Sequence, residues 1–179
     1  MSSAMLSVLL TFNNKTALWM SKHLYAPSVL FILGAKLDVQ GVSKVDFKQP
    51  NVFVCNHQSF IDIVVMMKVA ECDLYFVAKD ELKKVPFLGW YMRAVGMIFV
   101  KRGSSIAAQK SLVKAGELIR KGKSIILFPE GTRSKDGSIG TFKKGAFHVA
   151  LEAGVKIVPV AMEGGRNVLP NEILKINPG

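Results

Sequence analysis

Hydrophobic and polar positions alternate from residue 51 onward in a way that predicts two kinds of element. Five apolar runs are short and rich in Val, Ile and Phe, as buried strands are; they cover 51–55, 73–78, 97–100, 124–128 and 156–161. The longer stretches between them have helical spacing and cover 60–69, 87–94, 105–120 and 146–153. Strands that alternate with helices predict an α/β fold, with a largely parallel central sheet flanked by helices.

The N-terminal part of the chain follows a different pattern, with two apolar stretches at 5–12 and 17–35. The first stretch lacks the basic start of a secretory signal peptide. A clean membrane span needs about 20 predominantly apolar residues, and the second stretch is interrupted by Lys22, His23 and Pro27. We therefore predict a monotopic helical hairpin that lies in a membrane interface. The alternative is a pair of ordinary core helices.

The length of the chain limits the number of domains. With 179 residues, half of them hydrophobic, the chain can bury one sizeable core. We predict a helical membrane-association segment over residues 1–36 and one α/β domain over residues 37–179.

Composition narrows the class of partner. The formal net charge is +11 and the sequence pI is near 9.8, which favours partners that carry phosphate. The mean hydropathy is also positive, +0.29, and a chain both basic and apolar suits a membrane surface better than a nucleic-acid groove. Aromatic residues are not interleaved with basic ones as single-strand platforms require, so nucleic acid is not expected as a partner. Cys55 and Cys72 lie among apolar residues, which predicts core packing in a reducing compartment.

Candidate functional residues follow the predicted strands at their carboxyl ends. His57 follows the first strand, Lys101 and Arg102 follow the third, and Glu130 and Arg133 follow the fourth. In open parallel sheets, ligands bind at the carboxyl ends of the strands. These residues are therefore expected to share one edge of the sheet.

The stretch NHQSFIDI pairs a histidine with a carboxylate five residues later. A carboxylate can fix the tautomer of an imidazole and stabilise its cation, which makes His57 a candidate general base and Asp62 its orienter. Ser59 and Asp62 also have the spacing of a capping box, so the alternative is that Asp62 only caps a helix. The two interpretations are compatible.

Cations and a glycine-rich loop give two candidate phosphate sites. In GMIFVKRG, Arg102 offers a bidentate fork and Lys101 a point charge, the alternative being a solvated basic turn. In LFPEGTRS, a strand breaks at a proline and a loop dense in donors follows, an arrangement typical of an oxyanion or phosphate cradle. An ordinary ion pair between the acid and the arginine of that loop is the alternative. The loop residues are Glu130, Gly131, Thr132 and Arg133.

Two other features of the sequence carry less chemistry. Pro159, in IVPVAM, predicts a strand end or a bulge. His23 and His148 have no partners at metal-ligand spacing, so no metal site is predicted.

In this order, the blocks NHQSFID, GMIFVKRG, FPEGTRS and IVPVAM resemble the four sequence blocks of the glycerophospholipid acyltransferases, in particular the 1-acylglycerol-3-phosphate O-acyltransferases. The resemblance implies a membrane-associated enzyme on the cytoplasmic face that needs no separate cofactor. It would transfer an acyl group from acyl-CoA or acyl-carrier protein to the sn-2 hydroxyl of 1-acylglycerol 3-phosphate, giving phosphatidic acid. Members of this family usually continue past the fourth block, so a fragment or a C-terminally shortened domain is expected.

The resemblance also implies roles for single residues. His57 corresponds to the catalytic base, Asp62 to its orienter and Arg102 to a ligand of the acceptor phosphate. The stretch from Glu130 to Arg133 corresponds to the acceptor-binding block, and Pro159 falls in the block associated with the acyl donor. Many relatives have an acid where Lys101 stands, so acceptor preference is open.

Two other functions stay open alongside this one. The first is acylation of glycerol 3-phosphate or another lysophospholipid. The second is a non-catalytic module that binds acidic membranes through its basic surface.

Overall fold

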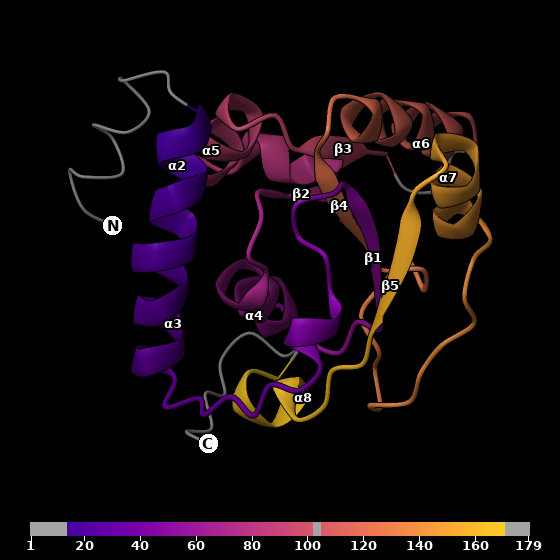
Figure 1. The fold of residues 1–179 in the computed structure, drawn as a ribbon. Coiled ribbons are helices and arrows are strands. Elements are labelled where there is room, and N and C mark those ends of the chain that lie inside the picture. The colour runs from indigo at the N-terminus through magenta and orange to yellow at the C-terminus, as the bar shows by residue number, and fades with distance from the viewer. Residues whose placement is uncertain (1–13, 102–104, 171–179) are drawn as a thin grey trace.

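A five-stranded parallel sheet forms the centre of the protein in a computed structural model that describes residues 14–101 and 105–170 (Figure 1). Its order is β3-β2-β4-β1-β5 and every strand pairing is parallel. The predicted α/β fold is confirmed. The strands are β1 Asn51–Cys55, β2 Leu74–Lys79, β3 Ile98–Val100, β4 Ser124–Leu127 and β5 Lys156–Val160.

Four helices connect the strands, as the apolar spacing predicted. They are α4 Ile61–Val69, α5 Leu88–Ala94, α6 Ser105–Arg120 and α7 Gly145–Ala153. Each of these strands and helices begins and ends within one residue of its predicted bounds. The pattern did not predict the short helix α8, Gly165–Val168, or the 3-10 turns Val42–Lys44 and Asp80–Lys84, because so few residues show no periodicity.

One helical column stands beside the sheet and contains α2, Asn14–Met20, and α3, Ala26–Ile32 (Figure 1). A π-helical turn, Ser21–Tyr25, joins the two, and π-turns occur mostly as single bulges within α-helices. The Ser21 hydroxyl, buried in this bulge, donates to the carbonyl of Ala17 (2.9 Å) and pairs with the Tyr91 hydroxyl. The column is thereby joined to α5.

The predicted hairpin is only partly within the described residues. Its second stretch forms the α2–α3 column, whereas residues 5–12 lie outside the described part of the chain. Among the described residues, no helix has both the length and the apolar character needed to cross a membrane.

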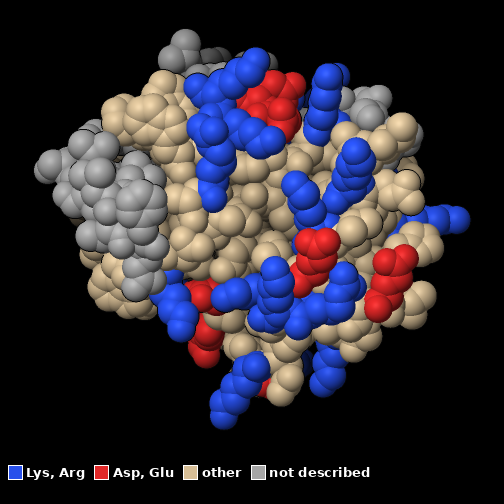
Figure 2. All heavy atoms as spheres, turned by 90° about the horizontal axis from the view of Figure 1, so that it is seen from above, with Lys and Arg blue, Asp and Glu red and all other residues tan. Residues whose placement is uncertain are grey.

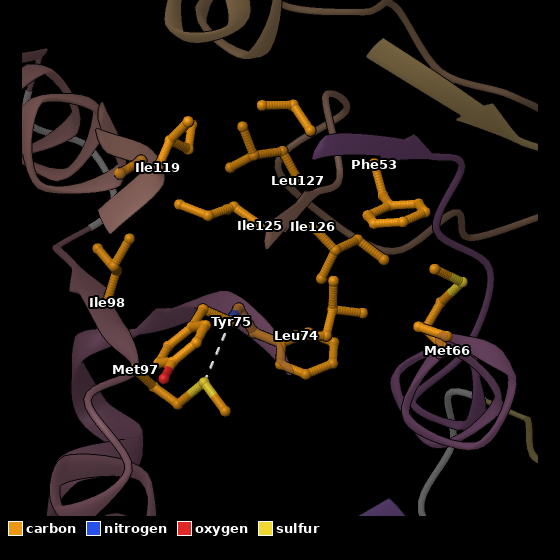
Figure 3. Close-up of a cluster of buried hydrophobic side chains, with 14 of the residues drawn as sticks. Phe53, Met66, Leu74, Tyr75, Met97, Ile98, Ile119, Ile125, Ile126 and Leu127 are labelled. Carbon is orange, nitrogen blue, oxygen red and sulfur yellow. Dashed lines mark hydrogen bonds between the residues drawn. The ribbon is translucent and has the colours of Figure 1, made fainter. Parts of the chain in front are cut away.

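The core lies around the three inner strands, β2, β4 and β1. Ile125 and Ile126 of β4 are fully buried, and Phe53 of β1 and Leu74 of β2 lie in the same cluster (Figure 3). The N–H of Phe76 donates to the sulfur of Met97 at 3.2 Å (dashed line in Figure 3). A strand buried on both faces is nearly continuously apolar, and this packing fixes the ends from which the functional loops leave.

Candidate active site

His57 and Asp62 meet at the carboxyl end of β1. The Nδ1 atom of His57 lies 2.9 Å from Asp62 Oδ2, and the two residues are 9% and 1% exposed. The same carboxylate oxygen accepts the backbone N–H groups of Gln58 (2.7 Å) and Ser59 (2.8 Å). One oxygen of Asp62 therefore contacts both the imidazole and the turn that leads into α4. The contact predicted for an orienting carboxylate and the contact predicted for a helix cap are both present. Donation from Nδ1 leaves a lone pair on Nε2, the form that a general base requires.

Phe128, which directly follows β4, fixes the plane of the imidazole. Its ring stacks on that of His57 with centroids 3.9 Å apart and planes 20° apart. The apolar pattern predicted Phe128 only as the last residue of a strand. Its contact with His57 follows from the pairing of β4 with β1, which places their carboxyl ends side by side.

The loop after β4 fixes the backbone of His57 on both sides. Glu130, which is 8% exposed, accepts the His57 N–H through Oε2 (2.7 Å) and the Gly140 N–H through Oε1 (3.0 Å). The N–H of Ser134 donates to the His57 carbonyl at 2.7 Å. Glu130 was predicted within an acceptor-binding block; its observed contacts are with backbone groups that position the histidine.

The other predicted cations differ in their distance from His57. Arg133 is exposed and directly precedes Ser134, whose N–H donates to the His57 carbonyl, so it lies beside residues 56–59, the loop that carries His57 and is called the catalytic loop below. Lys101 is exposed at the end of β3, three strand spacings from β1, or roughly 14 Å. A hydrogen bond from Lys83 lowers the pKa of Asp80, and the charges of Lys83 and Lys101 lower it further.

The remaining predicted residues are placed as follows. Arg102 lies outside the described residues. Gly131 has a φ of +73°, which favours glycine, and Thr132 is exposed. Pro159 is exposed within the edge strand β5, where the missing N–H of a proline is tolerated.

Lys143 is a cation that the sequence analysis did not select. A Cβ built on Gly131 would lie 2.8 Å from its Nζ, so the ammonium lies over the turn after β4. The N–H of Lys143 donates to the carbonyl of Pro129 (3.0 Å), which holds this side of the loop in place. In the sequence it is one of two adjacent lysines, Lys143 and Lys144, and this pair gave no signal by itself.

Cys55 is not a nucleophile partner for the histidine. Burial raises the pKa of its thiol to about 12, and the negative charges of Asp62 and Glu130 add to that increase. A thiol with this pKa is protonated at neutral pH. The prediction of Cys55 as a small core residue is confirmed by its complete burial.

Comparison with known proteins identifies the family. The family model described as Acyltransferase matches residues 36–163. The chain belongs to the acyltransferase family. A chloroplastic 1-acyl-sn-glycerol-3-phosphate acyltransferase of Brassica napus is 39% identical over 136 residues, which are 75% of this chain and 39% of the relative. The human 1-acyl-sn-glycerol-3-phosphate acyltransferase alpha is 35% identical over 137 residues, 75% of this chain and 48% of the relative.

A solved structure shares the fold of this chain. The crystal structure of the 1-acyl-sn-glycerophosphate acyltransferase from Thermotoga maritima has a TM-score of 0.77 and 30% identity. The match covers 89% of this chain and 63% of the other. The chain spans 39% and 38% of the lengths of two chloroplastic relatives, from Brassica napus and Arabidopsis thaliana.

The two backbone contacts of Glu130 predict that its side chain stabilises the fold of this chain. Glu130→Gln is expected to lower the free energy of unfolding by about 1–3 kcal/mol, because an amide group cannot accept both backbone N–H groups. Urea denaturation measures the change. Glu152→Gln, on the exposed side of α7, is the control and should stay within about 0.5 kcal/mol of the wild type. Equal stability of the two variants would contradict the positioning role.

Proposed function

We propose that this acyltransferase transfers a fatty acyl group from acyl-CoA or acyl-carrier protein to the sn-2 hydroxyl of 1-acylglycerol 3-phosphate. The product would be phosphatidic acid. The observation that carries the proposal is the 2.9 Å contact between His57 Nδ1 and Asp62 Oδ2 at the carboxyl edge of the sheet. The proposal is supported by relatives that are named 1-acyl-sn-glycerol-3-phosphate acyltransferases.

The chemistry needs one base that later becomes an acid. Nε2 of His57 takes the proton of the acceptor hydroxyl while the hydroxyl oxygen attacks the carbonyl carbon of the thioester. The π electrons of the carbonyl move to its oxygen, which becomes the oxyanion of a tetrahedral intermediate. When the tetrahedral intermediate collapses, the carbon–sulfur bond breaks and the thiolate takes the proton from the imidazolium. Asp62 stabilises that cation through Nδ1. No covalent enzyme intermediate is needed.

The acceptor phosphate would bind to the cations beside the catalytic loop. Arg133 adjoins Ser134, whose N–H contacts the His57 carbonyl, and Lys143 lies over Gly131. An arginine can grip a phosphate through two parallel N–H groups. In this scheme Lys101, directly after β3, extends the basic region to the far edge of the sheet. Arg102 lies outside the described residues, and its role as a phosphate ligand stays a prediction.

Arg133→Ala is expected to raise KM for the phosphorylated acceptor by about 10–100-fold, because it removes a charge-assisted hydrogen bond of about 1.5–3 kcal/mol. KM for the acyl donor should change little. Lys135→Ala, an exposed cation in the same loop, is the control for lost surface charge. Acceptor kinetics measured at fixed donor concentration test this, and equal KM values for the two variants would remove Arg133 from the site.

Membrane attachment is proposed through the outer side of the α2–α3 column. One side of the column buries small and aliphatic residues in the protein, such as Ala26 and Leu30. The other side exposes large apolar residues: Trp19, Leu24, Tyr25, Phe31 and Ile32. Apolar side chains of this size on an exposed helix are typical of helices that lie in a membrane interface.

We place the enzyme at the cytoplasmic face because both described cysteines are free thiols, as in a reducing compartment.

Replacing Phe31 and Ile32, which are 88% and 76% exposed, with serine is expected to weaken vesicle binding by about 10–100-fold. The matched control is Leu151→Ser, since Leu151 is 79% exposed. It belongs to α7, a helix on the opposite side of the molecule from the column (Figure 1). Cosedimentation with anionic vesicles measures the effect. If the Leu151 variant lost as much binding as the double variant, the column would not be the membrane-facing surface.

An acceptor panel separates the proposed function from its two alternatives. The purified chain is incubated with labelled acyl-CoA and, in turn, 1-acylglycerol 3-phosphate, glycerol 3-phosphate and a lysophospholipid with a larger headgroup. We expect transfer to 1-acylglycerol 3-phosphate. Transfer only to another acceptor would support the related enzymes, whereas vesicle binding without transfer to any of them would support a basic membrane module. Lys and Arg side chains are spread over the face shown in Figure 2. This basic surface is compatible with the proposed function, with the related enzymes and with the membrane module, so it does not distinguish them.

A further inference from the structure

The chain segment after β5 is fastened to the catalytic loop at both of its ends. We call this segment, residues 162–169 with helix α8, the strap. The Asn56 amide donates to the carbonyl of Met162 (2.9 Å) and accepts its N–H (2.8 Å). At the other end, the Ser59 hydroxyl donates to the carbonyl of Leu169 (2.6 Å). Asn56 and Ser59 flank His57 in the sequence, so the strap is tied to the catalytic loop itself.

Between these ties the strap touches the catalytic carboxylate through Gly165. A Cβ built on Gly165 would lie 2.7 Å from Asp62 Oδ1 and 3.1 Å from Ile61 Cγ2. The first distance is shorter than real Cβ contacts allow, so only glycine fits. Gly165 does not have a positive φ, and the reason for a glycine is therefore this contact. The neighbouring Gly164 is the reverse case, with a φ of +76° and nothing within 4 Å of a built Cβ.

The atom under the strap is unusual. Asp62 Oδ1 is buried and has no hydrogen-bond partner among the described residues, whereas Oδ2 accepts three. A buried carboxylate oxygen without a partner costs free energy, so it persists only where the surroundings enforce it. The strap belongs to those surroundings: Val168 and Leu169 pack in a cluster with Ile61 of α4 and Leu30 of α3.

We infer that the strap positions the catalytic carboxylate, with Gly165 as a positioning residue that covers Asp62 Oδ1 and keeps water from it. Because Oδ1 is covered and Oδ2 is held by two backbone N–H groups, the carboxylate cannot rotate away from the imidazole. Its charge then acts on the ring of His57, where the cation forms during acyl transfer. The expected effect on kcat rests on the proposed function. The positioning of Asp62 by the strap does not depend on that function.

Gly165→Ala tests the contact, and Gly164→Asn is the matched control because asparagine tolerates a positive φ and would meet no neighbour. In Gly165→Ala we expect kcat to fall by about 10–100-fold, the effect of a misplaced catalytic group, with KM for donor and acceptor unchanged. Gly164→Asn should keep kcat within about twofold. Equal kcat for Gly165→Ala and wild type would overturn the inference.

A second experiment separates positioning from a general packing defect. Gly165→Ala is introduced into the Asp62→Asn variant, and kcat of the double variant is compared with that of Asp62→Asn alone. If Gly165 acts through the carboxylate, Gly165→Ala should lower kcat by less than about twofold in the Asp62→Asn variant. A packing defect would make Gly165→Ala lower kcat by the same factor in the wild type and in Asp62→Asn, and that result would overturn the inference. If Gly165→Ala does not fold, Asn56→Ala takes its place, because it removes the hydrogen bonds that hold the strap at Met162. Its effect on kcat is then compared in the wild type and in Asp62→Asn in the same way.

A third readout does not depend on turnover. The Nδ1 proton of His57, hydrogen-bonded to Asp62 and shielded from water, should give a low-field proton NMR signal in the wild type and in Gly164→Asn. It should be shifted or lost in Gly165→Ala, and an unchanged signal there would overturn the inference. A wild-type chain that transfers no acyl group would refute the proposed function, and the NMR comparison would still decide whether the strap positions Asp62.

Discussion

His57→Ala is expected to lower kcat by about 10²–10⁴-fold, the usual contribution of a general base. The ring stacks on Phe128 and donates to Asp62, so some stability is lost as well. The backbone contacts from Glu130 and Ser134 stay, because they involve the main chain of residue 57. The variant should therefore fold and still bind vesicles through the α2–α3 column.

Turnover, melting temperature and vesicle binding are to be measured on one preparation of this variant. His148→Ala, at an exposed position of α7, is the control for removal of a histidine and should keep wild-type turnover. A folded His57→Ala with full activity would end the assignment of His57 as the base. Loss of turnover together with loss of folding would call for His57→Gln, which retains more of the packing against Phe128.

Asp62→Asn is expected to lose activity almost as severely, by about 10²–10⁴-fold, for a different reason. The amide oxygen can take the place of Oδ2 and accept the N–H groups of Gln58, Ser59 and the imidazole. The amide nitrogen would then take the place of Oδ1, where its N–H groups meet no acceptor among the described residues, at some cost in stability. The hydrogen bonds that Oδ2 accepts are kept while the negative charge is removed, so the change in turnover reports the stabilisation of the imidazolium.

A purely capping role for Asp62 predicts the opposite result. In that case the variant would lose roughly 1 kcal/mol of stability at most and would turn over nearly as fast as the wild type. Urea denaturation and turnover on the same sample distinguish the two. The structure makes this comparison sharp, because a single carboxylate oxygen makes the contacts required by both roles.

The elements of the fold could be predicted because their signals are local. Strands such as β1 and β4 are short, continuous apolar runs, and α6 has 16 residues with amphipathic spacing. The contact between His57 and Asp62 is local too. They are five positions apart, so one turn into helix α4 is enough to bring the carboxylate to the ring.

The partners of this pair could not be predicted because they come from distant segments. Glu130 is 73 residues from His57, and Met162 is 106 residues from Asn56. They meet because β4 and β5 are the two neighbours of β1, so the loops after these strands leave beside His57. The strand order is a property of the packed sheet. The same order puts Lys101, after the edge strand β3, away from the ring.

The sequence by itself therefore determined the strands, the helices and the histidine–aspartate pair, since each depends on residues within a few turns of one another. The tertiary structure decided how that pair is held. Only the packed sheet brings Phe128 onto the ring, Glu130 onto the main chain of His57 and Gly165 against Asp62. Gly165 gives no sign of this in the sequence, because the space that excludes a side chain is created by another segment of the chain.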